Sequence, residues 1–168
     1  GMRLVLFGLF LKMVVADNIG TLVDQVYAAP QDFGRADIVL AMVLYSFQIY
    51  GDFFGYSTIA LGCARMMGFT LTDNFRTPYL ADSIREFWHR WHISLSTWFR
   101  DYLYIPLGGN RVKLPRWMLN TMVVFTVCGI WHGANWTFML WAAAYGVLLI
   151  VEKLAGSKNG RWRWMHVA

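Results

Sequence analysis

Two of the four histidines, His89 and His92, lie in the most charged and most aromatic stretch of the sequence, from Ser83 to Asn110. At about 100° per residue, a helix through this stretch would have one cationic, titratable face and one face rich in tryptophan. The first face would carry Arg85, His89, His92 and Ser96. The second would carry Ile84, Phe87, Trp91 and Trp98. This pattern predicts an amphipathic helix at, or dipping into, a membrane surface.

This face admits three kinds of chemistry. Glu86, His89 and His92 are spaced three apart, which would suit a metal ion, but membrane di-iron enzymes use many more than four histidines, so no metal site is predicted. A basic helix that binds lipid headgroups is a second interpretation. In the third, His92 is a catalytic or orienting group and the arginines, with Arg90 and Arg100 among them, anchor a phosphate-bearing cofactor.

His132 lies in an apolar segment between Trp131 and Gly133. On a helix its face would carry Thr121, Phe125 and Cys128, so no charged partner is close in sequence. An ionisable group inside a membrane segment is a candidate functional residue, although a structural histidine bonded to a neighbouring helix fits equally well. Apolar surroundings would keep the imidazole neutral, which is the form that a general base requires.

Three further charged residues are interpreted as structural. Asp52 lies in the middle of a long apolar run, and we expect a buried hydrogen-bond acceptor that joins helices. Arg100 and Asp101 are sequence neighbours, which do not face each other on a helix, so plain interfacial charges are the expectation.

The composition indicates an all-α, polytopic membrane protein. Of the 168 residues, 57% are hydrophobic and only 15% are charged, against about 25% charged in soluble domains. The net charge of +5 is distributed between apolar segments, so we assign it to topology and to anionic lipid headgroups, with no nucleic acid as partner. The two cysteines show no spacing typical of a disulfide framework or a zinc site.

Four apolar segments are expected to be helical. Residues 4–15 are short for a span and predict a truncated span or an interfacial helix, with an amphipathic continuation over 16–26. A helix over 36–67 would be about 48 Å long, against a hydrocarbon core of about 30 Å, which predicts a steep tilt or a break near residues 51–55. Residues 117–134 and 136–151 would form either a tight hairpin or one long kinked helix.

Charge places these segments relative to the membrane. Residues 76–116 contain seven Lys or Arg and three Asp or Glu, so this loop is predicted to be cytoplasmic. A basic tail begins at about residue 152. The sequence starts Gly1-Met2, and we expect residues 1–168 to be a single, partial catalytic domain of a longer protein.

Two ordered blocks carry a resemblance to a known family. FWHRWHISLSTWFRDYLYIPLGGNR at 87–111 and GIWHGANWTFMLW at 129–141 resemble the membrane-bound O-acyltransferase (MBOAT) family, in particular its bacterial branch that O-acetylates alginate. The upstream blocks at 12–28, 48–69 and 74–88 agree, so the likeness covers nearly all of residues 3–154.

The resemblance implies acyl transfer, with acetyl as the expected group, from a cytoplasmic thioester to a hydroxyl of an exported polysaccharide in the bacterial inner membrane. It implies His132 and His92 as catalytic residues in a tunnel. The expected donor-binding residues are Arg85, His89, Arg90, Ser96, Arg100 and Asn135. The donor would be acyl-coenzyme A or an acyl-carrier thioester, with no tightly bound cofactor, and periplasmic acetyltransferases would be partners. Two alternatives are a relay that passes the acyl group to a separate transferase, and a non-enzymatic transporter or scaffold.

Overall fold

A computed structural model describes residues 1–156 of the chain. The chain divides into two compact units, the first over Gly1–Asn74 and the second beginning at Phe75. The predicted basic tail lies outside the described residues from residue 157 on, and this part includes His166. The described residues are helical apart from turns and one isolated β-bridge, which confirms the predicted all-α class.

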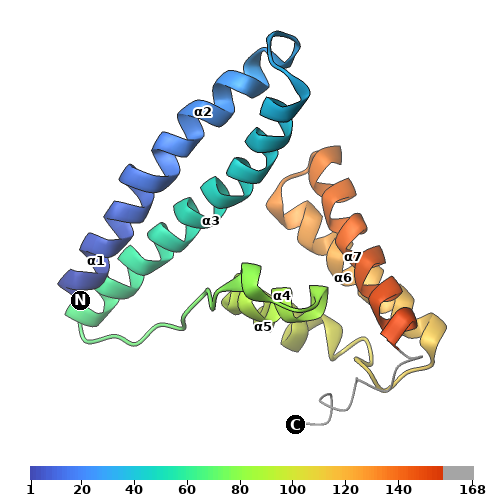
Figure 1. The fold of residues 1–168 in the computed structure, drawn as a ribbon. Coiled ribbons are helices and arrows are strands. Elements are labelled where there is room, and N and C mark those ends of the chain that lie inside the picture. The colour runs from blue at the N-terminus through green and yellow to red at the C-terminus, as the bar shows by residue number, and fades with distance from the viewer. Residues whose placement is uncertain (157–168) are drawn as a thin grey trace. The chain divides into compact units, whose positions relative to one another are not determined.

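The first unit is a helical hairpin (Figure 1). α1 (Met2–Leu9), a π-helical segment (Phe10–Ala16) and α2 (Asp17–Ala28) follow one another without interruption. After a short turn, α3 (Arg35–Met66) returns along them. The two predicted N-terminal segments are thus one helical run.

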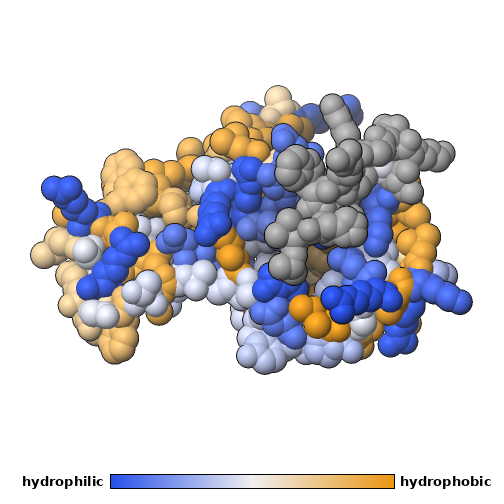
Figure 2. Space-filling view, turned by 90° about the horizontal axis from the view of Figure 1, so that it is seen from below, coloured by the Kyte–Doolittle hydropathy of each residue, from blue (hydrophilic) through white to orange (hydrophobic). Residues whose placement is uncertain are grey.

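Among residues 1–156, three helical segments are long and apolar enough to cross a membrane: Met2–Ala28, Arg35–Met66 and Trp136–Gly156. α3 continues through residues 51–55, so the predicted break is absent, and its 32 residues extend about 48 Å. Of the two options that the sequence left open, the break is thus excluded and the steep tilt stays a prediction. Large hydrophobic side chains cover much of the surface, as expected for a membrane protein (Figure 2).

Glycines allow the two arms of the hairpin to approach closely. Gly51 and Gly55 form a Gly-x-x-x-Gly motif on α3, which permits tight packing of membrane helices. A Cβ atom at Gly55 would lie 2.8 Å from the Gly8 carbonyl oxygen, and a Cβ at Gly8 would lie 2.6 Å from the Gly55 carbonyl oxygen. The backbones are therefore in direct contact at this pair.

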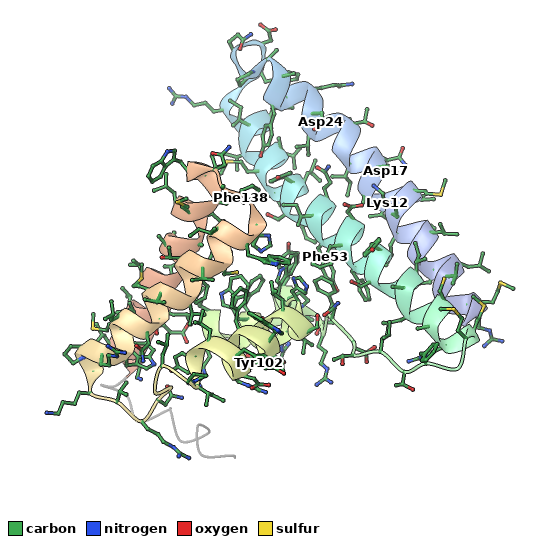
Figure 3. All side chains as sticks on the ribbon, turned by 180° about the vertical axis from the view of Figure 1, so that it is seen from behind. Lys12, Asp17, Asp24, Phe53, Tyr102 and Phe138 are labelled. Carbon is green, nitrogen blue, oxygen red and sulfur yellow. The ribbon has the colours of Figure 1, made fainter. Side chains whose placement is uncertain are left out.

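A charged cluster also joins the arms: Lys12 and Asp17 lie on the first arm (Figure 3), and Asp52 lies on α3. Lys12 Nζ lies 2.6 Å from Asp17 Oδ1 and 2.8 Å from Asp52 Oδ1. Asp52 therefore connects the helices as predicted, but through an ion pair, and its side chain is 52% exposed within this chain. The expectation of burial was wrong, and the partner on the facing helix is the charged side chain of Lys12.

The second unit contains two short helices and a helical hairpin. α4 (Ile84–Arg90) and α5 (Ile93–Phe99) precede a π-helical turn and the loop that contains Gly108 and Gly109. α6 (Leu114–His132) and α7 (Trp136–Gly156) pack against each other. The hairpin alternative for these segments is confirmed.

The predicted continuous helix from residue 83 is interrupted between α4 and α5. Trp91 is extended and forms an antiparallel bridge with Phe75, next to a hydrogen bond from Arg76 N to Arg90 O. His92 follows in the left-handed region with φ 45°, and the chain restarts as a helix. Pairing with residues 75–76, distant from the helical pattern, thus breaks the amphipathic face in two.

Candidate functional site

A pocket of about 290 Å³ lies within the second unit. α4 contributes Arg85 and His89, α5 contributes Ser96, and Arg100 lies just beyond α5. These are four of the six residues predicted to bind the donor. They line the same pocket even though the predicted continuous helix is interrupted between α4 and α5. Apolar side chains from α6 and α7, among them Val124 and Leu149, complete the lining.

The pocket concentrates positive charge. Desolvation, followed by the nearby charges of Arg85 and Arg100, lowers the pKa of His89, whose side chain stays partly exposed. Lys153, at the end of α7, also lines the pocket and lies over the Trp117 ring at 3.6 Å from its centroid. The arrangement suits an amphipathic ligand with an anionic group.

His92 and His132 are forty residues apart in sequence but interact in the folded unit. Desolvation, and then the charge of His132, lower the pKa of His92 to about 4. The His92 ring lies 6.2 Å from the Trp131 ring, and Trp131 in turn contacts His132 at 4.9 Å between centroids. After the break at Trp91, His92 thus lies near the Trp131 ring, which His132 also contacts.

His132 is the last residue of α6, followed by Gly133, whose φ of 157° ends the helix. Its ring packs against those of Phe138 and Trp141 on α7, at 6.1 Å and 5.4 Å between centroids. The side chain is exposed within this chain. His132 is therefore at the end of a helix rather than in its interior, and its surroundings are the aromatic side chains of α7.

Two predicted donor-binding residues have structural contacts away from the pocket lining. Arg90 pairs with Glu86 and donates to the carbonyl oxygens of Thr77 and Leu80, which fixes the turn before α4. Asn135 Oδ1 accepts a hydrogen bond from Thr137 N at 3.2 Å, at the start of α7.

Arg100 and Asp101 form a two-point ion pair, with Nε to Oδ1 at 2.7 Å and Nη2 to Oδ2 at 3.2 Å. The expectation that these neighbours would not face each other was wrong. The guanidinium is long enough to fold back onto the next residue, and the backbone here is π-helical. Asp101 therefore partly offsets the positive charge of Arg100 at the pocket.

Sequence reasoning missed Trp88 and Glu152. Both line the pocket, and in each a buried polar atom, Trp88 Nε1 and Glu152 Oε1, has no hydrogen-bond partner among the described residues. Trp88 lies among many other aromatic residues of the stretch 83–110, and Glu152 lies at the start of the predicted basic tail, so neither was singled out. Among residues 1–156, no group of three or more His, Cys, Asp or Glu side chains is placed to hold a metal ion.

Comparisons with known proteins identify the family of the chain. The sequence profile of the MBOAT, membrane-bound O-acyltransferase family, matches residues 3–157. The chain is 45% identical to the probable alginate O-acetylase AlgI of Azotobacter vinelandii over 87% of the chain and 29% of that protein.

It is 41% identical to the peptidoglycan O-acetyltransferase of Helicobacter pylori, over 91% of the chain and 29% of that protein. It is 32% identical to the teichoic acid D-alanyltransferase of Bacillus subtilis, over 76% of the chain and 34% of that protein. The chain thus spans about a third of the length of these curated relatives. Because the family profile covers almost the whole chain, the chain belongs to the membrane-bound O-acyltransferase family.

Proposed function

We propose that this chain is the part of a membrane O-acyltransferase that carries its two catalytic histidines and binds its acyl donor. The observation that carries the proposal is the packing of both His92 and His132 against the Trp131 ring, in the same unit as a cation-lined pocket. The proposed reaction transfers an acetyl group from a thioester to a hydroxyl of an exported polysaccharide such as alginate. The alginate and peptidoglycan O-acetyltransferase names of the relatives support this class of acceptor.

In the proposed mechanism, the acceptor hydroxyl oxygen attacks the thioester carbonyl carbon while His132 takes the hydroxyl proton. The carbon–sulfur bond then breaks, and the departing thiolate receives that proton. The low pKa of His92 keeps its imidazole neutral near pH 7, with one N–H able to donate to the carbonyl oxygen as negative charge develops there. His92 would stabilise the oxyanion in this way.

The donor is proposed to be acyl-coenzyme A or an acyl-carrier thioester, used as a substrate without any tightly bound cofactor. Phosphate oxygens of either donor would pair with Arg85, Arg100 and Lys153, while the apolar lining accommodates the rest of the arm. His89 and Ser96 would add hydrogen bonds.

The protein is proposed to lie in the bacterial inner membrane, among lipids, with residues 76–116 on the cytoplasmic side. Periplasmic acetyltransferases are proposed as partners. A single cysteine at Arg111, in a background without Cys63 and Cys128, tests the topology. Labelling of Arg111→Cys by a membrane-impermeant maleimide in intact spheroplasts would contradict the cytoplasmic location, whereas labelling only after permeabilisation is expected.

Polymer acetylation in cells that express the full-length protein tests the function. We expect His132→Asn and His92→Asn to abolish acetylation at normal membrane levels, with His166→Asn as a matched histidine control. Asparagine is preferred over alanine at position 92 because it tolerates positive φ. Normal acetylation by the His132→Asn variant would contradict the mechanism. A relay role would instead appear as acyl transfer to a partner protein in membranes without polysaccharide.

A further inference from the structure

We infer that Glu152 is a positioning residue, which holds α4 at the donor pocket through the backbone N–H of Ile84. Glu152 Oε2 accepts a hydrogen bond from Ile84 N at 2.7 Å, across 68 residues of sequence. Ile84 is the first residue of α4, and the next residue, Arg85, lines the pocket together with His89 one turn later. A shift of Ile84 would therefore move both side chains.

The seven residues of α4 cannot maintain their position alone, because short isolated helices are marginal in stability. Stacked and edge-on rings hold one side of the helix to α7: Phe87 lies 6.1 Å and Trp88 5.2 Å from Tyr145 between centroids. Stacked rings allow sliding in their plane, whereas the hydrogen bond to Glu152 fixes one backbone atom of α4 along the axis of α7. The rings thus set the distance between the helices, and the carboxylate sets the register.

The Glu152 carboxylate also satisfies an N–H group of the first turn of α4, which has no partner within the helix. Its other oxygen, Oε1, is buried without a hydrogen-bond partner among residues 1–156. An amide at this position could therefore keep the bond to Ile84 through its oxygen without losing any described contact. This predicts that glutamine, but not alanine, replaces Glu152.

Two measurements on the full-length protein test the inference. In membranes supplied with labelled acetyl-coenzyme A and alginate, Glu152→Ala should raise the donor KM roughly tenfold or more, as expected for loss of a hydrogen bond to a charged group, with little change in the polymer KM. Glu152→Gln should stay within about threefold of wild type. Asp82→Asn is the matched control, because it neutralises an exposed carboxylate in the loop before α4.

Hydrogen exchange of the Ile84 amide, resolved by fragmentation mass spectrometry, is the second measurement. It should accelerate in Glu152→Ala and remain slow in Glu152→Gln and Asp82→Asn. If Glu152→Ala does not reach the membrane, Glu152→Asp can replace it, because aspartate withdraws the carboxylate by one methylene. Glu152→Asp should show a smaller rise in donor KM and a smaller acceleration of Ile84 exchange.

Unchanged Ile84 exchange in the alanine or aspartate variant would overturn the inference. So would an unchanged donor KM in an active variant, or an equal defect in Glu152→Gln. The kinetic part rests on the proposed function, and a wild-type protein that transfers no acetyl group would refute that function. In that case the exchange result alone decides whether Glu152 anchors α4.

Discussion

Replacing Gly55 by alanine is expected to loosen the first helical hairpin. The new Cβ would lie 2.8 Å from the Gly8 carbonyl oxygen, 3.1 Å from Lys12 N and 3.3 Å from Leu11 Cβ. Two of these atoms belong to backbone, so no side-chain rotation relieves the contact. The helices would have to separate by about half an ångström, and overpacking of this kind costs about 1–3 kcal/mol.

Gly51 provides a matched control on the same helix. A Cβ there meets its nearest atom, Ala16 Cβ, at 3.5 Å, which is an ordinary van der Waals contact. Gly51→Ala also gains helix propensity of about 0.8–1 kcal/mol. The two substitutions add the same atom to the same Gly-x-x-x-Gly motif, so a difference between them reports interhelical packing alone.

Thermal unfolding in detergent, followed by circular dichroism, measures the effect. Since both variants share the gain in helix propensity, Gly55→Ala should have a Tm about 2–12 °C below that of Gly51→Ala, because 1 kcal/mol corresponds to about 2–4 °C for a protein of this size. Gly51→Ala should leave Tm unchanged or raise it. Equal effects of the two substitutions, or a more stable Gly55→Ala protein, would refute the close backbone packing of α1 against α3.

Two further predictions concern the second unit. Gly129→Ala should lower Tm more than Gly146→Ala. A Cβ at position 129 would lie 2.9 Å from the Phe138 carbonyl oxygen, whereas the nearest atom to a Cβ at position 146 is the sulfur of the flexible Met122 side chain. Equal shifts in Tm would contradict this packing. Because the pKa of His92 is about 4 in the fold and about 6.5 when unfolded, the unfolded chain binds more protons between these values, so Tm should fall as pH drops from 6.5 toward 4. His92→Asn should reduce that acid-dependent loss, and an unchanged pH profile would contradict the assigned pKa.

Much of the architecture could be predicted from the sequence because the apolar segments are long and the family blocks are ordered. The apolar pattern predicted the helical class and the hairpin as one alternative for α6 and α7. The free-energy cost of a carboxylate inside an apolar run predicted the link from Asp52 to another helix. The continuity of α3 was not predicted, since a helix longer than the hydrocarbon core left a break near residues 51–55 open, while the glycines there provide close packing against α1.

Four of the six predicted donor-binding residues share the pocket, but the continuous helix expected to align them is not formed. Helical periodicity placed His92 on a face with Arg85 and His89, but a bridge between Trp91 and Phe75 ends that periodicity. This pairing could not be predicted from the helical pattern, because Phe75 lies outside the stretch 83–110 in which that pattern occurs. Glu152 was missed for the same reason, because its partner lies 68 residues away and no local pattern connects them.

The most direct test of the central claim is a double-mutant cycle in kcat/KM for acetyl transfer by the full-length protein. Two histidines that act in one step should each cost most of the activity when replaced, and His92→Asn combined with His132→Asn should be no slower than the worse single variant. Losses that simply add in free energy would contradict a shared step. A His132→Asn enzyme with wild-type kcat/KM would remove this histidine from the chemistry altogether.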